Sequence, residues 1–382
     1  MTQKQRVGIV YGGKSGEHEV SLQTARAVIN AFDKDKYEIS PIYITKEGEW
    51  RMGNQLPDVI EDVDQLSFSR ETSKSGLATL FGHLNDRQEQ PVVSLHAVDA
   101  EISSPQSAPP HFDVMLPLLH GTNGEDGTIQ GLFEMANVPY VGAGVLASAV
   151  GMDKVLMKKV FAQAGLPQCI YRHFAASEWE KNQAYLVMDM EVSIGYPCFI
   201  KPANLGSSVG ISKARNREEL IEGVAYALRF DRKVVVEEFV DAREIEVAVL
   251  GNEEPEASVA GEIVSSSDFY DYKAKYVDGT SAMIIPAEIE PDVSEQIRDM
   301  ARTAFRAIDG SGLSRVDFFM RKDDGALFIN EINTMPGFTP YSMYPLLWKE
   351  SGLAYPELLD RLIQLALERY NGKQKLSFGM ES

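Results

Sequence analysis

Two carboxylates, a carboxamide and a guanidinium occur at strand spacing on both sides of a short turn. Asp317 and Glu331 flank the turn sequence at 323–325, and Arg315 and Asn333 lie two residues further out. A three-residue loop that ends in glycine is a common hairpin connection. A hairpin centred on residue 324 pairs position 317 with 331 and position 315 with 333. Because side chains two residues apart on a strand share a face, the four polar groups are expected to converge.

This set of side chains is compatible with two kinds of site. The carboxylates and the carboxamide supply hard oxygen ligands of the kind that Mg²⁺ takes together with substrate phosphates. Alternatively, they form ordinary cross-strand charge pairs on a solvated hairpin. The following sequence at 334–337 breaks the strand and brings backbone N–H groups beside these ligands. Four apolar residues alternate with the polar ones and are predicted to point into a core: Val316, Phe318, Phe328 and Ile332.

A lysine inside an apolar strand precedes a glycine-serine loop. Lys201 follows Phe199 and Ile200, and the loop at 203–211 contains two glycines and two serines. Hydroxyl and backbone N–H groups in such a loop can fold over phosphates, with the lysine as a point charge beside them. The alternative is an ordinary hairpin loop. Burial of a lysine without a partner is costly, which favours the phosphate interpretation.

Two glycine-rich loops near the N-terminus follow predicted strands. The turn at 12–16 leads into a helix that starts near Glu17, and such a turn exposes N–H groups that suit an anion. Glu17 is either a first-turn acid stabilised by the helix dipole or a ligand for a substrate ammonium group. His120 opens the loop at 120–127, at the carboxyl end of a strand where open α/β sheets bind ligands. It can equally be a hydrogen-bonding loop residue.

The composition of the 382 residues excludes some classes of protein. A formal net charge of −19 argues against a large nucleic-acid surface, which needs many lysines and arginines. The only two cysteines, Cys169 and Cys198, form no CxxC pair, so neither a disulfide framework nor a zinc site is predicted. No apolar stretch approaches the roughly 20 residues that span a bilayer, and the first strand begins too early for a signal region. We expect a reduced, cytoplasmic protein that does not bind membranes.

The pattern of elements predicts an α/β protein that is α+β in part. Strands at 6–11, 37–44 and 112–119 alternate with helices at 17–32 and 128–135, which is typical of an open parallel sheet. Beyond residue 166 the strands become antiparallel in character. The segment 264–286 is polar, aromatic and lysine-bearing, and it suits an active-site lid. Residues 50–111 are expected to form small surface structure without chemistry.

Seven motifs, in this order along the chain, resemble the D-alanine–D-alanine ligases, a family of ATP-grasp carboxylate–amine ligases. They are GGKSGEHEVS at 12–21, LHGTNGEDGTIQG at 119–131, MDK at 152–154, KPANLGSSVGIS at 201–212, REIEVAVLG at 243–251, FYDYKAKY at 269–276 and NEINTMPGFTPYSMYP at 330–345. The resemblance covers nearly the whole chain. It implies a three-domain ATP-grasp fold, with an N-terminal domain at 1–152, a central one at 153–235 and a C-terminal one at 236–382 that carries the lid.

The resemblance implies that ATP is gripped between the central and C-terminal domains. The residues it assigns to ATP are Lys154 and Lys201 at the α- and β-phosphates, Ser207 and Ser208 over them, Glu237 and the backbone of Val240 at the adenine, Glu244 at the ribose, Phe269 against the base and Lys275 at the transferred phosphate. It further implies that Asp317, Glu331 and Asn333 hold two Mg²⁺ or Mn²⁺ ions, with Glu331 bridging both. A monovalent cation such as K⁺ is left open.

The resemblance also assigns the amino-acid site and the reaction. Glu17 and His120 would bind the first D-alanine, and Ser342 with the backbone of Met343 would take the carboxylate of the second. A carboxylate must become an acyl phosphate before an amine can attack it. Arg315 and the N–H of Gly337 would then stabilise the oxyanion of the tetrahedral intermediate.

The choice of second substrate is linked to the lid. In this family a tyrosine at the position of Tyr276, connected through Ser207 to Glu17, accompanies peptide formation. The chain is therefore expected to make D-alanyl-D-alanine for peptidoglycan precursors and, like the family, to form a homodimer. A D-alanine–D-lactate or other D-amino-acid ligase is the alternative within the class. A catalytically silent nucleotide-binding protein of the same fold is the alternative outside it.

Overall fold

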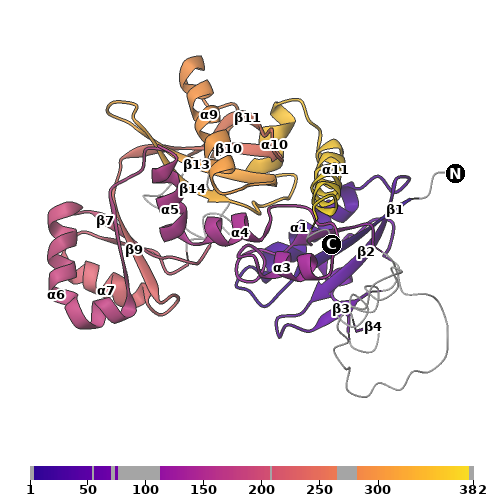
Figure 1. The fold of residues 1–382 in the computed structure, drawn as a ribbon, viewed down its shortest axis with the longest axis horizontal. Coiled ribbons are helices and arrows are strands. Elements are labelled where there is room, and N and C mark those ends of the chain that lie inside the picture. Colours follow the sequence, from indigo (N-terminus) through magenta and orange to yellow (C-terminus); the bar gives the residue numbers. More distant parts are fainter. Residues whose placement is uncertain are drawn as a thin grey trace.

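Three β-sheets follow one another along the chain in the computed structural model, which describes residues 4–53, 56–69, 74–75, 112–206, 209–264 and 282–377. Figure 1 shows them as three groups, with the N-terminal sheet at the right, the central sheet at the left and the C-terminal sheet at the top. We propose one domain around each sheet, near the predicted divisions. The predicted boundary between residues 235 and 236 falls inside strand β9, which spans Lys233–Glu238.

The N-terminal sheet has the order β4-β3-β2-β1-β5. Its strands are β1 (Gln5–Gly12), β2 (Tyr37–Ile44), β3 (Trp50–Met52), β4 (Lys74–Ser75) and β5 (Val114–Leu118); its helices are α1 (His18–Ala31), η1 (Val63–Leu66), α3 (Thr128–Met135) and α4 (Val145–Met152). Strands β2, β1 and β5 are parallel, as predicted, but β3 and β4 are antiparallel. The connection from β2 to β3 is too short for the crossover of a dozen or more residues that a parallel pair requires.

The central sheet is antiparallel and has the order β6-β9-β7-β8. It contains β6 (Tyr171–Ala175), β7 (Cys198–Pro202), β8 (Ser212–Ala214) and β9, with the helices α6 (Ala176–Ser193) and α7 (Arg217–Ala227). These helices pack on the sheet through a buried cluster that includes Trp179, Met190, Leu220 and Val224. Helix α5 (Lys154–Gln163) lies between the central and C-terminal sheets: Val155 packs with the central sheet, and Met157 and Phe161 pack with the C-terminal core.

The C-terminal sheet has the order β12-β11-β10-β13-β14. It contains β10 (Ala242–Gly251), β11 (Glu256–Val264), β12 (Ala282–Ile284), β13 (Gly312–Arg321) and β14 (Leu327–Asn333), followed or covered by α9 (Pro291–Ala307), α10 (Met343–Glu350) and α11 (Tyr355–Gln374). Helix α9 covers one face with residues at helical spacing, including Ile297, Ala301 and Phe305. On the opposite face, α10 and α11 cover one part of the sheet, and polar side chains lie on the other part.

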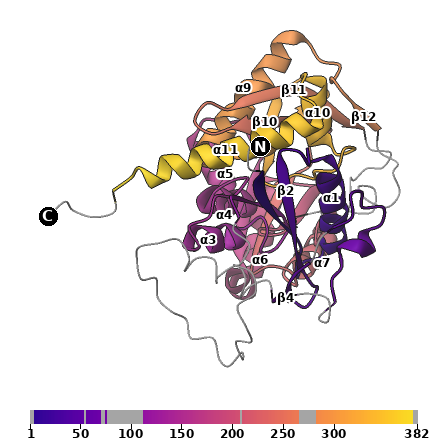
Figure 2. The ribbon, with the colours of Figure 1, turned by 90° about the vertical axis from the view of Figure 1, so that its right-hand side faces the viewer.

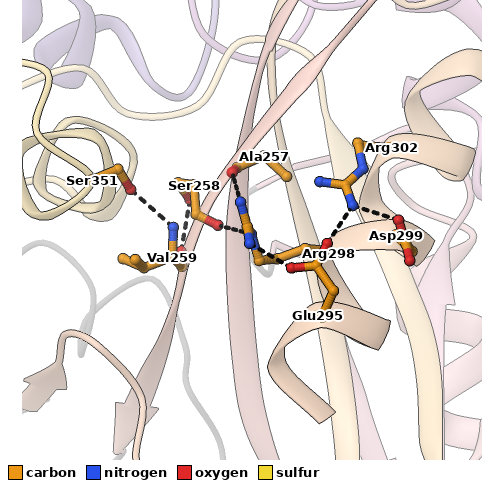
Figure 3. A network of polar contacts seen from close by, with 8 residues as sticks. All are labelled: Ala257, Ser258, Val259, Glu295, Arg298, Asp299, Arg302 and Ser351. Carbon is orange, nitrogen blue, oxygen red and sulfur yellow. Dashed lines mark hydrogen bonds and ion pairs between the residues drawn. The ribbon is translucent and has the colours of Figure 1, made fainter. Parts of the chain in front are cut away.

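Arg298 on α9 fastens this helix to strand β11 of the sheet (Figure 3). Arg298 donates to the carbonyl oxygens of Ala257 and Ser258 on β11, at 2.9 and 3.0 Å, and also contacts Glu295. From the other side, the backbone N–H of Val259 donates to Ser351 Oγ at 2.9 Å. Strand β11, which leads into the predicted lid segment, is therefore held from both faces.

The hairpin of β13 and β14 has the predicted register at its polar end. Arg315 pairs with Asn333 and Asp317 with Glu331, which confirms both predicted pairs. Gly325 in the turn has a φ of +72°, the left-handed conformation that the turn requires. The register shifts by one residue directly after Asp317.

Because of this shift, Ile329 points into the core in place of Phe328. Phe318 pairs with Ile329, which is fully buried. Phe328 is only partly buried and lies under the guanidinium of Arg321, 5.3 Å from ring centroid to Cζ. The prediction that Phe328 points into the core was wrong, because an extra residue on β14 moves the alternation by one position.

Helix α11, near the C-terminus, packs against both the N-terminal and the C-terminal sheets. Figure 2 shows it running between the N-terminal sheet and the C-terminal sheet, and its apolar residues share one core with β1, β5 and β10. Near its end Arg369 donates to the carbonyl oxygen of Tyr140 at 2.9 Å and to Ser311 Oγ at 2.6 Å. No helix within the described ranges has the length and apolar character of a membrane span.

Candidate active site

The predicted site residues fall into those that the structure describes and those that it does not. Ser207, Ser208, Phe269, Lys275 and Tyr276 lie outside the described residues, as does the predicted lid except for residues 264 and 282–286. Most of the remaining residues gather in four places: on facing elements of α5 and the central sheet, on one face of the C-terminal sheet, at the loops after β1 and β5, and in the segment from β14 to the start of α10.

Glu237 on β9 holds the buried Lys158 and the largely buried Lys201. Its Oε2 lies 2.5 Å from Lys201 Nζ on β7, and its Oε1 lies 2.6 Å from Lys158 Nζ on α5. Glu237 is 3% exposed and Lys158 2%. Burial would raise the pKa of the Glu237 carboxyl, but the two ammonium groups outweigh it and hold the pKa well below its usual range. We call these three residues the lysine triad; it carries one positive charge in excess.

The lysine triad explains how a lysine can stand in an apolar strand. Burial would lower the pKa of Lys201, but Glu237 and, further away, Glu331 raise it above its ordinary value, so Lys201 stays charged. Lys158 was missed at the sequence level. Its signal was its position four residues after Lys154 on one helix, because residues four apart on a helix share a face.

Lys154 connects the glycine-serine loop with the C-terminal sheet. Its Nζ donates to the carbonyl oxygen of Leu205 at 2.8 Å and lies 3.8 Å from Glu331 Oε2 on β14. The preceding Asp153 caps α5 through its carboxylate, which accepts from the backbone N–H groups of Val155 and Leu156 at 3.0 and 3.2 Å. This cap fixes the start of the helix that carries both Lys154 and Lys158.

Arg315 on β13 is held by two carboxylates. Its Nε and Nη2 each lie 2.7 Å from an oxygen of Asp317, and its Nε also lies 3.0 Å from Glu246 Oε2 on β10. Burial would lower the pKa of Arg315, but Asp317 and Glu246 raise it well above its ordinary value. We call these residues the arginine triad; it carries one negative charge in excess. Glu246 was not singled out from the sequence, where it reads as one polar position of an alternating strand.

The three predicted metal ligands share one face of the hairpin. Asp317 and Glu331 are direct cross-strand partners, and Asn333 is two residues from Glu331. The side-chain oxygen of Asn333 accepts from the N–H of Met335 at 2.9 Å, which orients the carboxamide. Across the described part of the chain, no three His, Cys, Asp or Glu side chains gather closely enough to hold a metal ion by themselves. Two carboxylates and one amide oxygen fit Mg²⁺ or Mn²⁺ only if phosphate oxygens or water complete the shell.

Glu17 lies where three loops meet. It directly precedes α1, and its side chain makes no capping hydrogen bond. A Cβ atom built on Gly121 would lie 2.6 Å from Glu17 Oε2, and one built on Gly206 would lie 3.6 Å from it. The carboxylate is therefore packed against both the loop after β5 and the glycine-serine loop. Ser15, also missed from the sequence, accepts from the N–H of Glu17 and donates to the carbonyl oxygen of His120 at 2.8 Å.

His120 is buried beside acidic groups. Its Nε2 lies 3.2 Å from Thr24 Oγ1, and its Nδ1 lies 3.7 Å from Glu125 Oε1. Burial would lower the pKa of His120, but Glu125 and, more weakly, Glu17 raise it above its ordinary value. Glu125, which also accepts from the backbone N–H of Gly121 at 2.9 Å, is a further residue that sequence reasoning missed.

The loop after β14 brings Gly337 and Ser342 together. A Cβ atom on Gly337 would lie 3.1 Å from Ser342 Oγ, and the same Oγ lies 2.8 Å from Thr339 Oγ1. Ser342 directly precedes α10, whose backbone N–H groups at the N-terminus suit a carboxylate. The side chain of Met343 is buried in the core, so only its backbone is left for a ligand.

Val240 and Glu244 lie at the connection between the central and C-terminal sheets. Val240 follows β9 and Glu244 is on β10, and both are half-buried. Glu244 shares its strand face with Glu246, since the two are two residues apart. The predicted nucleotide ligands Glu237, Val240 and Glu244 thus follow the chain from one sheet into the next.

Family models and named relatives of this chain point to one family, and together they cover almost the whole chain. Residues 6–143 match the family model described as "D-ala D-ala ligase N-terminus", and residues 160–364 match "D-ala D-ala ligase C-terminus". A D-alanine–D-alanine ligase of Bacillus licheniformis is 54% identical over 373 residues, which cover 98% of this chain and 99% of that protein. One of Geobacillus thermodenitrificans is 53% identical over 378 residues, which cover 99% and 100%.

Solved structures give the same result. The D-alanine–D-alanine ligase of Coxiella burnetii has a TM-score of 0.77 at 34% identity and covers 98% of this chain and 97% of its own. The VanG D-Ala:D-Ser ligase of Enterococcus faecalis has a TM-score of 0.80, also at 34% identity, and covers 95% and 100%. The predicted ATP-grasp fold is confirmed. On these matches, the chain belongs to the D-alanine–D-alanine ligase family.

Proposed function

We propose that this chain joins two D-alanines to D-alanyl-D-alanine, with ATP converted to ADP and phosphate and a D-alanyl phosphate as intermediate. The observation that carries the proposal is the position of Lys154. Its ammonium group contacts the glycine-serine loop at Leu205 and lies 3.8 Å from Glu331. A cation of the kind that suits phosphate thus stands between the elements that suit a nucleotide and the carboxylates that suit its metal ions. The chain is similar to its named relatives along its full length.

ATP would lie between the central and C-terminal sheets. Lys154 and Lys201 would contact the α- and β-phosphates, Glu237 and the backbone of Val240 the adenine, and Glu244 the ribose. Phosphoryl transfer needs mainly positioning and neutralisation of charge, and the positive excess of the lysine triad supplies fixed charge of the right sign. Ser207, Ser208, Phe269 and Lys275 complete this assignment by resemblance.

Asp317, Glu331 and Asn333 would hold two Mg²⁺ or Mn²⁺ ions. When bound, such ions neutralise phosphate oxygens and keep the reacting groups in line. The three side chains share one face of the hairpin, and they leave coordination positions that phosphate oxygens can fill. The negative excess of the arginine triad favours cations at this place.

The first D-alanine would bind with its ammonium group at Glu17, beside His120. The second would bind its carboxylate at Ser342 and the N-terminus of α10. Phosphorylation gives the first carboxylate a leaving group, and the amine of the second D-alanine then attacks the carbonyl carbon. The oxyanion that forms would meet the N–H of Gly337 and Arg315 Nη1, because the contacts to Asp317 and Glu246 engage Nε and Nη2.

The second substrate is the least constrained part of the proposal. One solved relative is described as a D-Ala:D-Ser ligase, so this fold accommodates different second substrates. We assign D-alanine because of the named relatives above 50% identity and because of Tyr276. A D-alanine–D-lactate ligase is the second candidate; replacement of Tyr276 by phenylalanine should raise incorporation of D-lactate if this tyrosine selects the amine.

The test is phosphate release from ATP with D-alanine alone, D-alanine with D-serine, D-alanine with D-lactate, and L-alanine, combined with the mass of each product. The expected result is release that depends on D-alanine and a product of the mass of D-alanyl-D-alanine. ATP turnover without dependence on D-alanine would overturn the assignment. A product that contains D-serine or D-lactate in preference would replace the second substrate and keep the reaction.

We further propose that the enzyme works as a cytoplasmic homodimer in peptidoglycan precursor synthesis. Its substrates are small soluble molecules, and both cysteines are buried and unpaired, as in a reducing compartment. Stimulation by K⁺ remains a prediction. Sedimentation of the purified protein tests the oligomeric state, and assays with K⁺ or Na⁺ as the only monovalent cation test the stimulation.

A further inference from the structure

Glu246 is a buried carboxylate beside the proposed metal ligands. The proposed reaction gives Glu246 no role. It lies on β10 directly opposite Asp317 on β13, and it is 5% exposed. Asp317 in turn lies opposite Glu331 on β14, so three carboxylates follow one another across three strands on the same face of the sheet. A buried carboxylate is costly unless charged or hydrogen-bonding groups compensate it. Its place in the row therefore calls for a role.

The contacts of Glu246 point to Arg315. The guanidinium Nε donates to Asp317 Oδ1 at 2.7 Å and lies 3.0 Å from Glu246 Oε2, so one cationic group lies close to both carboxylates. Glu246 is diagonal to Arg315 across the two strands, because Arg315 itself faces Ala248. Within the described residues no three acidic or other ligating side chains form a metal cluster, so a role for Glu246 as a third metal carboxylate is not supported.

The proposed function makes two demands on Asp317. As a metal ligand it must offer an oxygen to a cation, yet both of its oxygens lie 2.7 Å from Arg315. When Asp317 coordinates a cation, its carboxylate neutralises Arg315 less fully. Arg315 then needs another counter-charge to stay at the place where it would meet the oxyanion. Glu246 is that counter-charge, since it already lies within contact of the same Nε.

We propose that Glu246 is a positioning residue: it holds Arg315 in place and thereby allows Asp317 to bind metal. This inference rests on the proposed roles of Asp317 and Arg315. It concerns a group outside the proposed ligand set, which acts only through Arg315. It predicts that removal of the Glu246 charge weakens metal binding, because Arg315 then claims Asp317 more strongly.

The experiment is a titration of Mn²⁺ into the full chain with ADP present, with free Mn²⁺ read by electron paramagnetic resonance. Glu246→Gln removes the charge and keeps the size. Loss of a group that orients a metal ligand typically weakens metal binding about 10- to 100-fold, and we expect the Mn²⁺ dissociation constant to rise at least about tenfold. In an Arg315→Gln background the same substitution should change it less than about twofold, because the group through which Glu246 acts is gone.

A matched control exists on the opposite face of the same sheet. Glu262 on β11 accepts from Nε and Nη2 of Arg243 on β10 at 2.8 and 2.6 Å, in the same two-bond arrangement that joins Asp317 to Arg315. Glu262→Gln removes one buried carboxylate from an arginine without touching Arg315, and Mn²⁺ binding should stay as in the unmodified chain. A loss equal to that of Glu246→Gln would overturn the proposal, because the effect would then be general to the sheet.

Four further outcomes are decisive. An unchanged dissociation constant in Glu246→Gln overturns the proposal, and so does a tenfold loss that persists in the Arg315→Gln background, which would mean direct action on the metal. If Glu246→Gln unfolds, Glu246→Asp is measured instead, and it must weaken Mn²⁺ binding with Arg315 present and not with Arg315→Gln. Asp317→Asn separates this inference from the proposed function: unaltered Mn²⁺ binding there would refute the metal assignment itself.

Discussion

The lysine triad and the arginine triad are opposite solutions to the same problem. In the first, one carboxylate, Glu237, lies between two ammonium groups; in the second, one guanidinium, Arg315, lies between two carboxylates. Both are largely buried, and each retains one charge in excess. The excess is positive on the side assigned to the triphosphate and negative on the side assigned to its metal ions.

The excess charge of the two triads calls for an explanation other than stability. A buried ion pair contributes little net stability, because removal of two charges from water offsets their attraction. The excess charge is therefore best understood as a site prepared for a ligand of opposite sign. Lys154, 3.8 Å from Glu331, stands between the two triads, so the two kinds of ligand would meet there.

The largest expected effect concerns the centre of the lysine triad. Glu237→Gln leaves Lys158 and Lys201 buried without the carboxylate that they share. Breaking a buried pair in this way typically costs about 3–5 kcal/mol, and the free energy of unfolding in urea should fall by this amount. Asp324→Asn, at the exposed pair with Arg321, is the control and should leave the midpoint unchanged. Equal stability of Glu237→Gln and the unmodified chain would remove the basis of the comparison.

The next effect concerns the centre of the arginine triad and falls on rate. Arg315→Met removes the side chain assigned to the oxyanion, and loss of such a donor typically costs about 3–4 kcal/mol in the barrier, or about 100- to 1,000-fold in kcat. The KM for ATP should change much less. Steady-state kinetics with saturating D-alanine measure both. A change confined to KM would place Arg315 in substrate binding only.

The fold and the site were predictable to different depths. The register of Asp317 with Glu331 followed from the turn glycine and from alternation, since a slip by one residue would reverse the faces. The partial exposure of Phe328 did not follow from the sequence, because the extra residue in β14 has no local signal. Helix α6 was missed since few of its residues are buried and its backbone leaves helical geometry at Asn182, which disturbs the helical period.

The unpredicted site residues have a common cause. Lys158, Glu246 and Ser15 act on other side chains or on backbone groups, and their importance depends on contacts between distant parts of the chain. A pattern within one segment shows which face a residue occupies but not what the face opposite contributes. Groups that would touch substrate stood in recognisable motifs, whereas the groups that hold them did not.

The pH dependence of stability tests the charge of Glu237 at the centre of the lysine triad. The pKa of Glu237 is lower in the folded than in the unfolded chain, where it is near 4.5. Its contribution is thus present above that value and is lost as the pH falls below it, with a slope of at most about 1.4 kcal/mol per pH unit. Urea unfolding between pH 5 and pH 3 should show a shallower loss for Glu237→Gln than for the unmodified chain. Parallel curves would contradict the assigned pKa shift.

The smallest effect concerns the outer member of the lysine triad. Lys158→Met leaves Glu237 to Lys201 alone, which neutralises Lys201 more fully and weakens its attraction for phosphate. We expect the KM for ATP to rise about three- to tenfold, or about 1 kcal/mol, with little change in kcat or in the KM for D-alanine. Lys159→Met, at the neighbouring position of α5, is the control. A rise in the KM for D-alanine instead would place Lys158 outside the nucleotide site.

The most direct test of the two-triad account is calorimetric titration of ADP with and without Mn²⁺, in the unmodified chain, Lys201→Met and Asp317→Asn. We predict that Mn²⁺ strengthens ADP binding at least about tenfold in the unmodified chain, equivalent to about 1.4 kcal/mol. Lys201→Met should weaken ADP binding in both conditions, whereas Asp317→Asn should remove only the gain from Mn²⁺. An undiminished gain in Asp317→Asn would contradict the claim that the negative triad receives the metal of the nucleotide.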